Sequence, residues 1–326
     1  MKVARGTLRI GTRGSALALW QTERVRSLLA AAGYSTERVE IKTTGDLTPD
    51  VPLSSIGSRA LFTKQIDDAL LAGRVDLAVH SLKDLPTQLP EGVRIGAVGQ
   101  REDARDALVS RAQRQWESLP EGAVIATSSL RRRAQLLYHR PDLKVVDLRG
   151  NVDTRLAKLD ANTQWSAIVL ATAGLVRLGL DRRIGERLAP ELMLPAPGQG
   201  ALAVTVRDHD DDVAIAVRDA MHDPVTGLRA SAERSFLAGL EGGCQVPIAA
   251  HAVVRTGERQ SVLQLHGRVI APDGRAMVEG HQLGPVTSEE EASELGAALA
   301  ARLLAQGAGT ILAQSRDVSA PRITEP

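Results

Sequence analysis

The sequence predicts an α/β protein with two sheet-containing domains, followed by a small α+β domain with an antiparallel sheet. Short apolar runs alternate with segments of helical spacing in residues 1–110, and the same alternation resumes between residues 120 and 206. After residue 220 the pattern changes, and strands of alternating polarity follow one another. A chain of 326 residues has room for two or three domains.

The first series of elements starts near the N-terminus. It contains predicted strands at residues 8–11, 39–43 and 76–80 and predicted helices at residues 17–32 and 60–72. Gly33 and Gly73 follow the two helices, where glycine commonly ends a helix. Strands that alternate with helices pair in parallel, so we expect a mostly parallel sheet with helices on both faces.

Residues 45–58 separate the second strand from the second helix and contain two prolines, two glycines and several small polar residues. This composition predicts a long loop. Loops of this length in a compact domain are commonly functional lids or disordered segments. We favour a lid.

The second series predicts another sheet domain, with a cleft between the two. Predicted strands lie at residues 124–126, 143–146, 167–170 and 201–206, and predicted helices start at Ser129 and Asn151 or cover residues 173–178. The C-terminal part then shows a helix at 225–240, strands at 249–254, 262–269 and 276–283, and a helix at 289–305. Residues after Gln314 are predicted to form a loose tail.

Composition narrows the classes of function. The net charge is +1, with 43% hydrophobic and 24% charged residues, which is typical of a soluble globular protein without nucleic-acid or membrane partners. The N-terminus lacks the apolar run of a signal peptide, and a single cysteine fits a reducing compartment, so we expect a cytoplasmic protein. The seven histidines are scattered, so no metal site is predicted.

The single cysteine, Cys244, lies in the glycine-flanked loop 241–247, Glu-Gly-Gly-Cys-Gln-Val-Pro. Buried structural cysteines usually lie in regular apolar elements. A thiol next to two glycines is accessible to chemistry, because no neighbouring side chain covers it. We therefore favour an attachment point or nucleophile, with a structural thiol as the alternative.

Arginines follow the predicted cap of the helix that starts at Ser129. Ser128 or Ser129 caps this helix, so Arg131 and Arg132 fall in its first turn. Cations there oppose the helix dipole by about 0.3–1 kcal/mol each. A bound anion would reverse this cost, because free amides and guanidinium groups bind anions. The plainer alternative is a solvated helix face.

Other charged residues follow predicted strands in the same way. Arg13, Arg149, Arg155 and Arg177 lie near strand or helix ends, and ligands of open α/β sheets bind beyond the carboxyl ends of the strands. Their shared position predicts a ligand with several carboxylates or phosphates. Asp84, after the strand at 76–80, is either a cap or an ionised carboxylate that stabilises a cation or moves a proton in this cleft.

Taken together, these segments resemble the porphobilinogen deaminase (hydroxymethylbilane synthase) family. The resemblance covers residue 8 to the early 250s and continues more loosely to about Leu312. The order and spacing of the segments make it specific. The matching stretches are residues 9–15 (Arg-Ile-Gly-Thr-Arg-Gly-Ser), 79–84 (Val-His-Ser-Leu-Lys-Asp), 129–132 (Ser-Leu-Arg-Arg), 148–151 (Leu-Arg-Gly-Asn), 197–200 (Pro-Gly-Gln-Gly) and 241–244 (Glu-Gly-Gly-Cys).

The resemblance implies the reaction, the cofactor and the site. Four porphobilinogen molecules would be condensed head to tail into hydroxymethylbilane, with loss of ammonia, on a dipyrromethane primer joined to Cys244 by a thioether. Asp84 would be the catalytic residue. The carboxylates of the cofactor would be held by Lys83, Ser129, Arg131 and Arg132, and those of the substrate by Arg13, Ser15, Arg149, Arg155 and Arg177.

The resemblance also implies two periplasmic-binding-protein-like (type II) domains, and we expect a monomer. Domain 1 would comprise residues 1–100 plus 200–219, domain 2 residues 101–199 and domain 3 residues 220–314, with a tail at 315–326. One departure from the family pattern lies at residues 57–60, Gly-Ser-Arg-Ala, where many relatives have a Gly-Gly-Lys-Gly-like stretch. The positive charge is kept but flexibility is lower, which puts the behaviour of a lid in question.

Two other classes of function fit parts of the sequence. A non-catalytic binding or effector-sensing protein would use the same cleft and arginines but would need no glycine-flanked thiol. Binding of a polyanion or nucleic acid through Arg131–Arg133 fits poorly with 2% aromatic residues and a near-zero net charge. Intact mass separates the alternatives, because only the enzyme predicts a bound dipyrrole.

Overall fold

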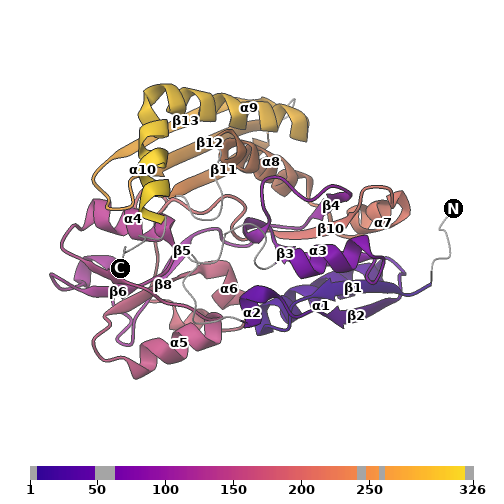
Figure 1. Ribbon diagram of the computed structural model, residues 1–326, viewed down its shortest axis with the longest axis horizontal. Coiled ribbons are helices and arrows are strands. Elements are labelled where there is room, and N and C mark those ends of the chain that lie inside the picture. The colour runs from indigo at the N-terminus through magenta and orange to yellow at the C-terminus, as the bar shows by residue number, and fades with distance from the viewer. Residues whose placement is uncertain (1–5, 48–62, 241–246, 257–260, 320–326) are drawn as a thin grey trace, which may run out of the picture.

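A computed structural model of the protein describes residues 6–47, 63–240, 247–256 and 261–319 (Figure 1). Most of the predicted lid and the cysteine loop, including Cys244, lie outside the described residues, as does the departure at residues 57–60. The chain forms three sheets, two with five strands and one with three.

The first sheet contains β2 (Thr36–Glu40), β1 (Leu8–Thr12), β3 (Leu77–Ser81), β10 (Leu202–Arg207) and β4 (Val93–Val98), in that order. β2, β1 and β3 pair in parallel, while β10 is antiparallel to both of its neighbours. The helices of this lobe are α1 (Ala16–Ala31), α2 (Thr44–Leu47), α3 (Lys64–Leu71) and α7 (Asp211–Met221). Apolar side chains such as Ile10, Leu29 and Val217 are fully buried between these helices and the sheet.

The second sheet repeats this pattern. Its strand order is β7 (Lys144–Val146), β6 (Val124–Ala126), β8 (Ala167–Ala171), β5 (Asp106–Val109) and β9 (Glu186–Arg187). β7, β6 and β8 are parallel, and β5 runs against β8 and β9. The helices of this lobe are α4 (Leu130–His139), α5 (Val152–Ala161) and α6 (Thr172–Arg177).

The chain crosses between the two lobes twice, and each crossing leads into the antiparallel strand of the sheet that it enters. Residues 99–105 precede β5, and residues 195–201 precede β10. The crossings touch each other, since the Glu102 amide donates to the Gly200 carbonyl at 3.0 Å. The two lobes are therefore joined by two connections that lie side by side.

The third sheet is antiparallel and contains β11 (Ile248–Thr256), β12 (Ser261–Ile270) and β13 (Met277–Val286). It packs against α8 (Pro224–Gly239) and α9 (Glu289–Leu303), with Phe236, Leu265 and Leu299 fully buried between them. In Figure 1 this unit lies beside both lobes. A π-helical turn, Leu304–Ala308, leads from α9 to α10 (Gly309–Ser319).

The helix Glu289–Gln314 is long and apolar enough to cross a membrane, judged by length and composition. Leu299 and Leu303 are nevertheless fully buried against the third sheet. The apolar stripe is thus used by the core of the C-terminal unit.

The predicted fold class is confirmed: two α/β lobes have mixed, mostly parallel sheets, and an α+β unit has a three-stranded antiparallel sheet. Several details differ. The second strand covers residues 36–40 instead of 39–43, and α10 continues to Ser319, so the predicted tail is helical over its first residues. The elements α2, β4, β5, β9 and α7 were not predicted, and α2 lies at the start of the segment predicted as a loop, 45–58. The three strands are short or lie beside the crossings, where no alternation of helices and strands indicates them.

Candidate active site

Asp84 follows a strand of the first sheet and lies beside the region where the two lobes meet, which we call the seam. β3 ends at Ser81, and a single 3₁₀ turn, Leu82–Asp84, carries the exposed carboxylate away from the buried strand. A pocket brings Asp84 together with Arg13 and Ser15, which come from the turn after β1. The Ser15 hydroxyl also caps α1, accepting from the Ala18 amide at 3.4 Å. Three predicted site residues therefore share one pocket.

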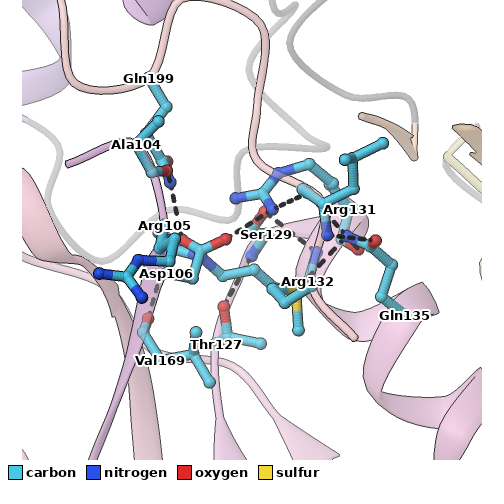
Figure 2. Close-up of polar contacts among 12 residues, drawn as sticks. Ala104, Arg105, Asp106, Thr127, Ser129, Arg131, Arg132, Gln135, Val169 and Gln199 are labelled. Atoms are coloured by element: carbon cyan, nitrogen blue, oxygen red, sulfur yellow. Dashed lines mark hydrogen bonds and ion pairs between the residues drawn. The ribbon is translucent and has the colours of Figure 1, made fainter. Parts of the chain in front are cut away.

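Arg131 and Arg132 meet a buried carboxylate that was not predicted, Asp106 at the start of β5 (Figure 2). Arg131 Nη1 lies 2.7 Å from Asp106 Oδ2, and Arg132 Nη2 lies 2.7 Å from Asp106 Oδ1. The N-cap of α4 is Ser129, whose hydroxyl accepts from the Arg132 amide at 3.4 Å. The solvated-face interpretation is wrong for this arginine pair, although the neighbouring Arg133 is exposed.

Lys83 joins the same cluster from the other lobe. Its Nζ donates to Gln199 Oε1 at 3.2 Å. Burial lowers the pKa of Lys83 to about 8; Asp84 and Asp106 raise it, and Arg132 and Arg131 lower it. Burial alone would raise the pKa of Asp106, but the two arginines and Lys83 hold it well below its usual range. One carboxylate thus faces three cationic groups, which leaves an excess of positive charge.

Arg149 and Arg155 extend this positive region along the second lobe. Arg155, in α5, donates from Nε to the Gly150 carbonyl at 2.8 Å. The pKa of Arg155 is lowered to about 10, chiefly by burial and also by the charge of Arg132, while the Asp84 carboxylate opposes this shift. The charges of both lobes therefore interact across the seam. Arg149 Nη1 is buried without a hydrogen-bond partner among the described residues, so it is a donor available to a bound anion.

Arg177, at the end of α6, makes its contacts in the region where the two lobes meet. Its Nη2 donates to the Gly200 carbonyl at 2.6 Å, and its guanidinium lies 5.7 Å from the ring centroid of Trp20 in α1. Burial lowers the pKa of Arg177 to about 10, while Glu102 raises it. Arg177, a residue of the second lobe, therefore contacts both the second crossing and a helix of the first lobe.

Two residues of this region, Asp106 and Gln199, were not among the predicted site residues. Asp106 is fully buried at the head of an apolar strand, and Gln199 is fully buried in the second crossing. A signal for Asp106 exists in the sequence: an arginine pair in the first turn of a helix needs a counter-charge. Its partner could not be identified, because it lies 25 residues away from Arg131 along the chain.

The two ends of the cysteine loop are placed by described residues. Leu240, after α8, and Ile248, at the start of β11, are both buried. Ala250 in β11 donates from its amide to the Pro195 carbonyl at 3.0 Å, which attaches this strand to the second crossing. The described residues on either side of residues 241–246 therefore lie in the core of the C-terminal unit, and β11 contacts the second crossing.

The donor set fits a ligand with several carboxylates. Cationic groups outnumber carboxylates in the cluster, and Arg149 contributes a buried donor without a partner. Guanidinium and ammonium groups are the usual partners of carboxylates. Over the described part of the chain, no group of three or more His, Cys, Asp or Glu side chains is arranged to hold a metal ion.

Comparisons with known proteins agree with this chemistry. The family model described as porphobilinogen deaminase, dipyromethane cofactor binding domain, matches residues 8–215, and that of the porphobilinogen deaminase C-terminal domain matches residues 227–305. A porphobilinogen deaminase of Rubrobacter xylanophilus is 52% identical over 314 residues, 96% of this chain and 99% of the relative. One of Nitratidesulfovibrio vulgaris is 48% identical over 308 residues, 94% of this chain and 96% of the relative.

A solved structure with some likeness is a nutrient binding protein from Burkholderia cenocepacia bound to methionine. It is 16% identical, and the match covers 68% of this chain and 94% of that chain with a TM-score of 0.43.

Proposed function

Since the chain belongs to the porphobilinogen deaminase family, we propose which of its residues perform the family's reaction. The enzyme is a transferase, hydroxymethylbilane synthase, that joins four porphobilinogen molecules head to tail and releases ammonia. The product is the linear tetrapyrrole of porphyrin and haem biosynthesis. The non-catalytic and nucleic-acid-binding alternatives do not agree with this family membership.

The dipyrromethane cofactor belongs to the domain that matches residues 8–215. When bound, it supplies the pyrrole end to which substrate units are joined. We propose that Cys244 holds it through a thioether and that Lys83, Ser129, Arg131 and Arg132 bind its carboxylates. The excess of cations around Asp106 supports this assignment.

The substrate carries an acetate and a propionate group, so it needs cationic partners of its own. We propose Arg13, Ser15, Arg149, Arg155 and Arg177 for this role. The unpartnered Arg149 Nη1 and the position of Arg13 and Ser15 in the Asp84 pocket support it. Arg177 contacts Gly200 of the second crossing and Trp20 of the first lobe, which places a further cation where the two lobes meet.

Asp84 is the proposed catalytic residue, and its exposed carboxylate in a pocket with Arg13 is the single observation that carries the proposal. A carboxylate oxygen of Asp84 would accept from the pyrrole N–H of the substrate. It would stabilise the positive charge that develops when ammonia leaves, in a fixed electrostatic environment. The same carboxylate would then take the proton that the pyrrole carbon releases when the new bond has formed.

Replacement of Asp84 by asparagine tests this role. Asp84→Asn keeps the shape but removes the negative charge, so we expect kcat to fall by about 100-fold or more while the cofactor remains attached. Single-turnover kinetics and intact mass measure the two effects. The control is Glu91→Gln, which removes an exposed carboxylate from the same connection between β3 and β4. A variant Asp84→Asn with a near-normal rate would remove Asp84 from the mechanism.

We also propose the domain limits and the setting of the enzyme. Residues 1–100 plus 200–219, 101–199 and 220–314 each contain one of the three sheets, which supports these limits as domains 1, 2 and 3. We propose a cytoplasmic monomer that binds neither nucleic acid nor membranes. The single cysteine and the near-zero net charge support this setting.

A further inference from the structure

Gln199 connects the charged groups of the two lobes. Its side chain is fully buried in the second crossing. Oε1 accepts from Lys83 Nζ of the first lobe at 3.2 Å, and Nε2 donates to Asp106 Oδ1 of the second lobe at 3.0 Å. Nε2 also donates to the Ala104 carbonyl in the first crossing at 2.7 Å. One carboxamide therefore contacts both lobes and the chain that joins them. Figure 2 shows Gln199 beside Ala104 and Asp106.

The backbone around Gln199 is held independently of its side chain. The Gln199 carbonyl accepts from Arg101 Nε at 2.8 Å, and the Gly198 amide donates to Glu233 Oε2 at 2.7 Å. Gly200 has a φ of +88°, and a Cβ atom there would lie 2.5 Å from the Glu102 carbonyl oxygen. The course of the main chain is thus set by its neighbours, and it directs the Gln199 side chain into the seam.

We propose that Gln199 is a positioning residue for the carboxylate-binding site: it places the Lys83 ammonium beside the Arg131–Arg132 pair, so that cations of both lobes face one ligand. The inference rests on the proposed function in one respect, that Lys83, Arg131 and Arg132 bind carboxylates. The placement itself is a feature of this structure and does not depend on that assignment.

Only glutamine satisfies both ends of this connection. An ammonium group requires an acceptor, and the ionised Asp106 requires a donor. A carboxamide presents one of each at the end of a side chain of this length. Glutamate has no donor for Asp106, asparagine is shorter by one carbon, and methionine has neither a strong acceptor nor a donor. The side chain is also shared between lobes, so its loss separates Lys83 from Asp106.

The charge on Lys83 depends on this contact. The groups that face Lys83 are Asp84 on its own turn, Asp106 of β5, Arg131 and Arg132 of α4, and the Gln199 oxygen. Because an acceptor stabilises the protonated amine, removing the Gln199 oxygen lowers the pKa of Lys83 below its present value of about 8. A carboxylate in its place raises the pKa. An apolar side chain and a carboxylate at position 199 should therefore shift the pKa of Lys83 in opposite directions.

Two variants and a direct probe test the proposal. In Gln199→Met the pKa of Lys83 should fall by about 1 unit, and in Gln199→Glu it should rise by about 1 unit or more. The lysines of the full-length protein are labelled with ¹³C-methyl groups and followed by NMR between pH 6 and 11. Lys83→Arg identifies the signal of Lys83.

A second measurement links the placement to binding. In Gln199→Met, apoprotein incubated with porphobilinogen should acquire the dipyrrole mass several-fold more slowly at pH 7, and the slowing should be larger at pH 8.5, where more of Lys83 is neutral. The control is Gln135→Met, which removes another buried carboxamide; Gln135 bonds to the Leu194 backbone and to Arg268. We expect it to lower the Tm comparably while the Lys83 titration stays unchanged.

The outcomes separate this inference from the proposed function. If both Gln199 variants move the Lys83 titration in the same direction, or neither moves it, Gln199 has only a structural role and the inference is wrong. The NMR titration does not depend on turnover, so it stays valid if Asp84→Asn retains activity and the catalytic assignment fails. A shift of the titration without any change in the rate of dipyrrole attachment would also overturn the inference, since Gln199 would then not position Lys83 for the cofactor carboxylates.

Discussion

At the scale of single residues, the site combines a carboxylate that the sequence indicates, Asp84, with one that it does not, Asp106. Asp84, Arg13 and Ser15 could be predicted, because each follows a recognisable strand, and the structure brings them into one pocket. Asp106 could not, because a buried aspartate at the head of an apolar run resembles any strand start. Only the folded chain brings it to Arg131 and Arg132, where it satisfies part of their charge.

Asp67 in α3 supports a prediction about pH. It is 3% exposed, and neither carboxylate oxygen has a hydrogen-bond partner among the described residues. Burial raises its pKa to about 6, above the value of about 3.9 expected in the unfolded chain. Folding therefore favours the protonated form of Asp67. The contribution of this group to the free energy of unfolding is complete below about pH 4 and is lost as the pH rises through 6.

Asp67→Asn removes this titration. Relative to the wild type, the variant should gain stability between pH 4.5 and pH 8, on the order of 2 kcal/mol in the free energy of unfolding. Urea denaturation at the two pH values measures the difference. The matched control is Asp68→Asn, which makes the same change at the exposed neighbour on the same helix. A stability difference that is equal at both pH values for Asp67→Asn would contradict this prediction.

At the scale of elements, most helices and strands follow from periodicity, and the exceptions have physical reasons. α1, α4 and α8 begin within a residue or two of the predicted starts, because each has a capping side chain at its N-terminus. β2 was misplaced by three residues, since Thr36–Glu40 is a polar edge strand without an apolar run. β5 and β4 border the crossings, and their pairing depends on contacts between distant segments.

The close approach of the two crossings gives a prediction at this scale. Gly200 has a φ of +88°, and a Cβ atom would lie 2.5 Å from the Glu102 carbonyl oxygen. Gly179 has a φ of +67° with nothing within 4 Å of a Cβ atom. Gly179→Ala therefore costs only the left-handed conformation, about 1 kcal/mol, whereas Gly200→Ala must also move the first crossing and should cost about 3 kcal/mol or more.

Urea denaturation of the two glycine variants measures these costs. Gly200→Ala should also weaken the hydrogen bond from the Glu102 amide to the Gly200 carbonyl, so it should lower substrate affinity in addition to stability. The control, Gly179→Ala, should leave affinity unchanged. Equal losses of stability in the two variants would show that the crossings are not packed as tightly as described.

At the scale of the whole molecule, the three sheets meet at one buried ion pair. Glu233 of α8 is fully buried, and its carboxylate lies 2.6 Å from Arg101 of the first crossing. The same carboxylate accepts from the Gly198 amide of the second crossing and the Ala252 amide of β11, both at 2.7 Å. Because these three contacts converge, the unit that carries the cysteine loop is held against both connections between the lobes.

Only part of this large-scale arrangement could be predicted from the sequence. Two lobes, a third unit and the chain crossings near residues 100 and 200 follow from alternation of elements and from the family resemblance. The ion pair of Glu233 and Arg101 joins residues 132 positions apart, so no local pattern reveals it. The same limit applies to the link from Lys83 through Gln199 to Asp106.

The central claim is that cations of both lobes surround a carboxylated dipyrrole that is joined to Cys244. Intact-mass and peptide mass spectrometry of the purified protein tests it most directly. We predict an added mass that matches two linked pyrroles, located on the peptide that contains Cys244 and missing in Cys244→Ala. An unmodified wild-type mass, or a dipyrrole retained in Cys244→Ala, would contradict the claim.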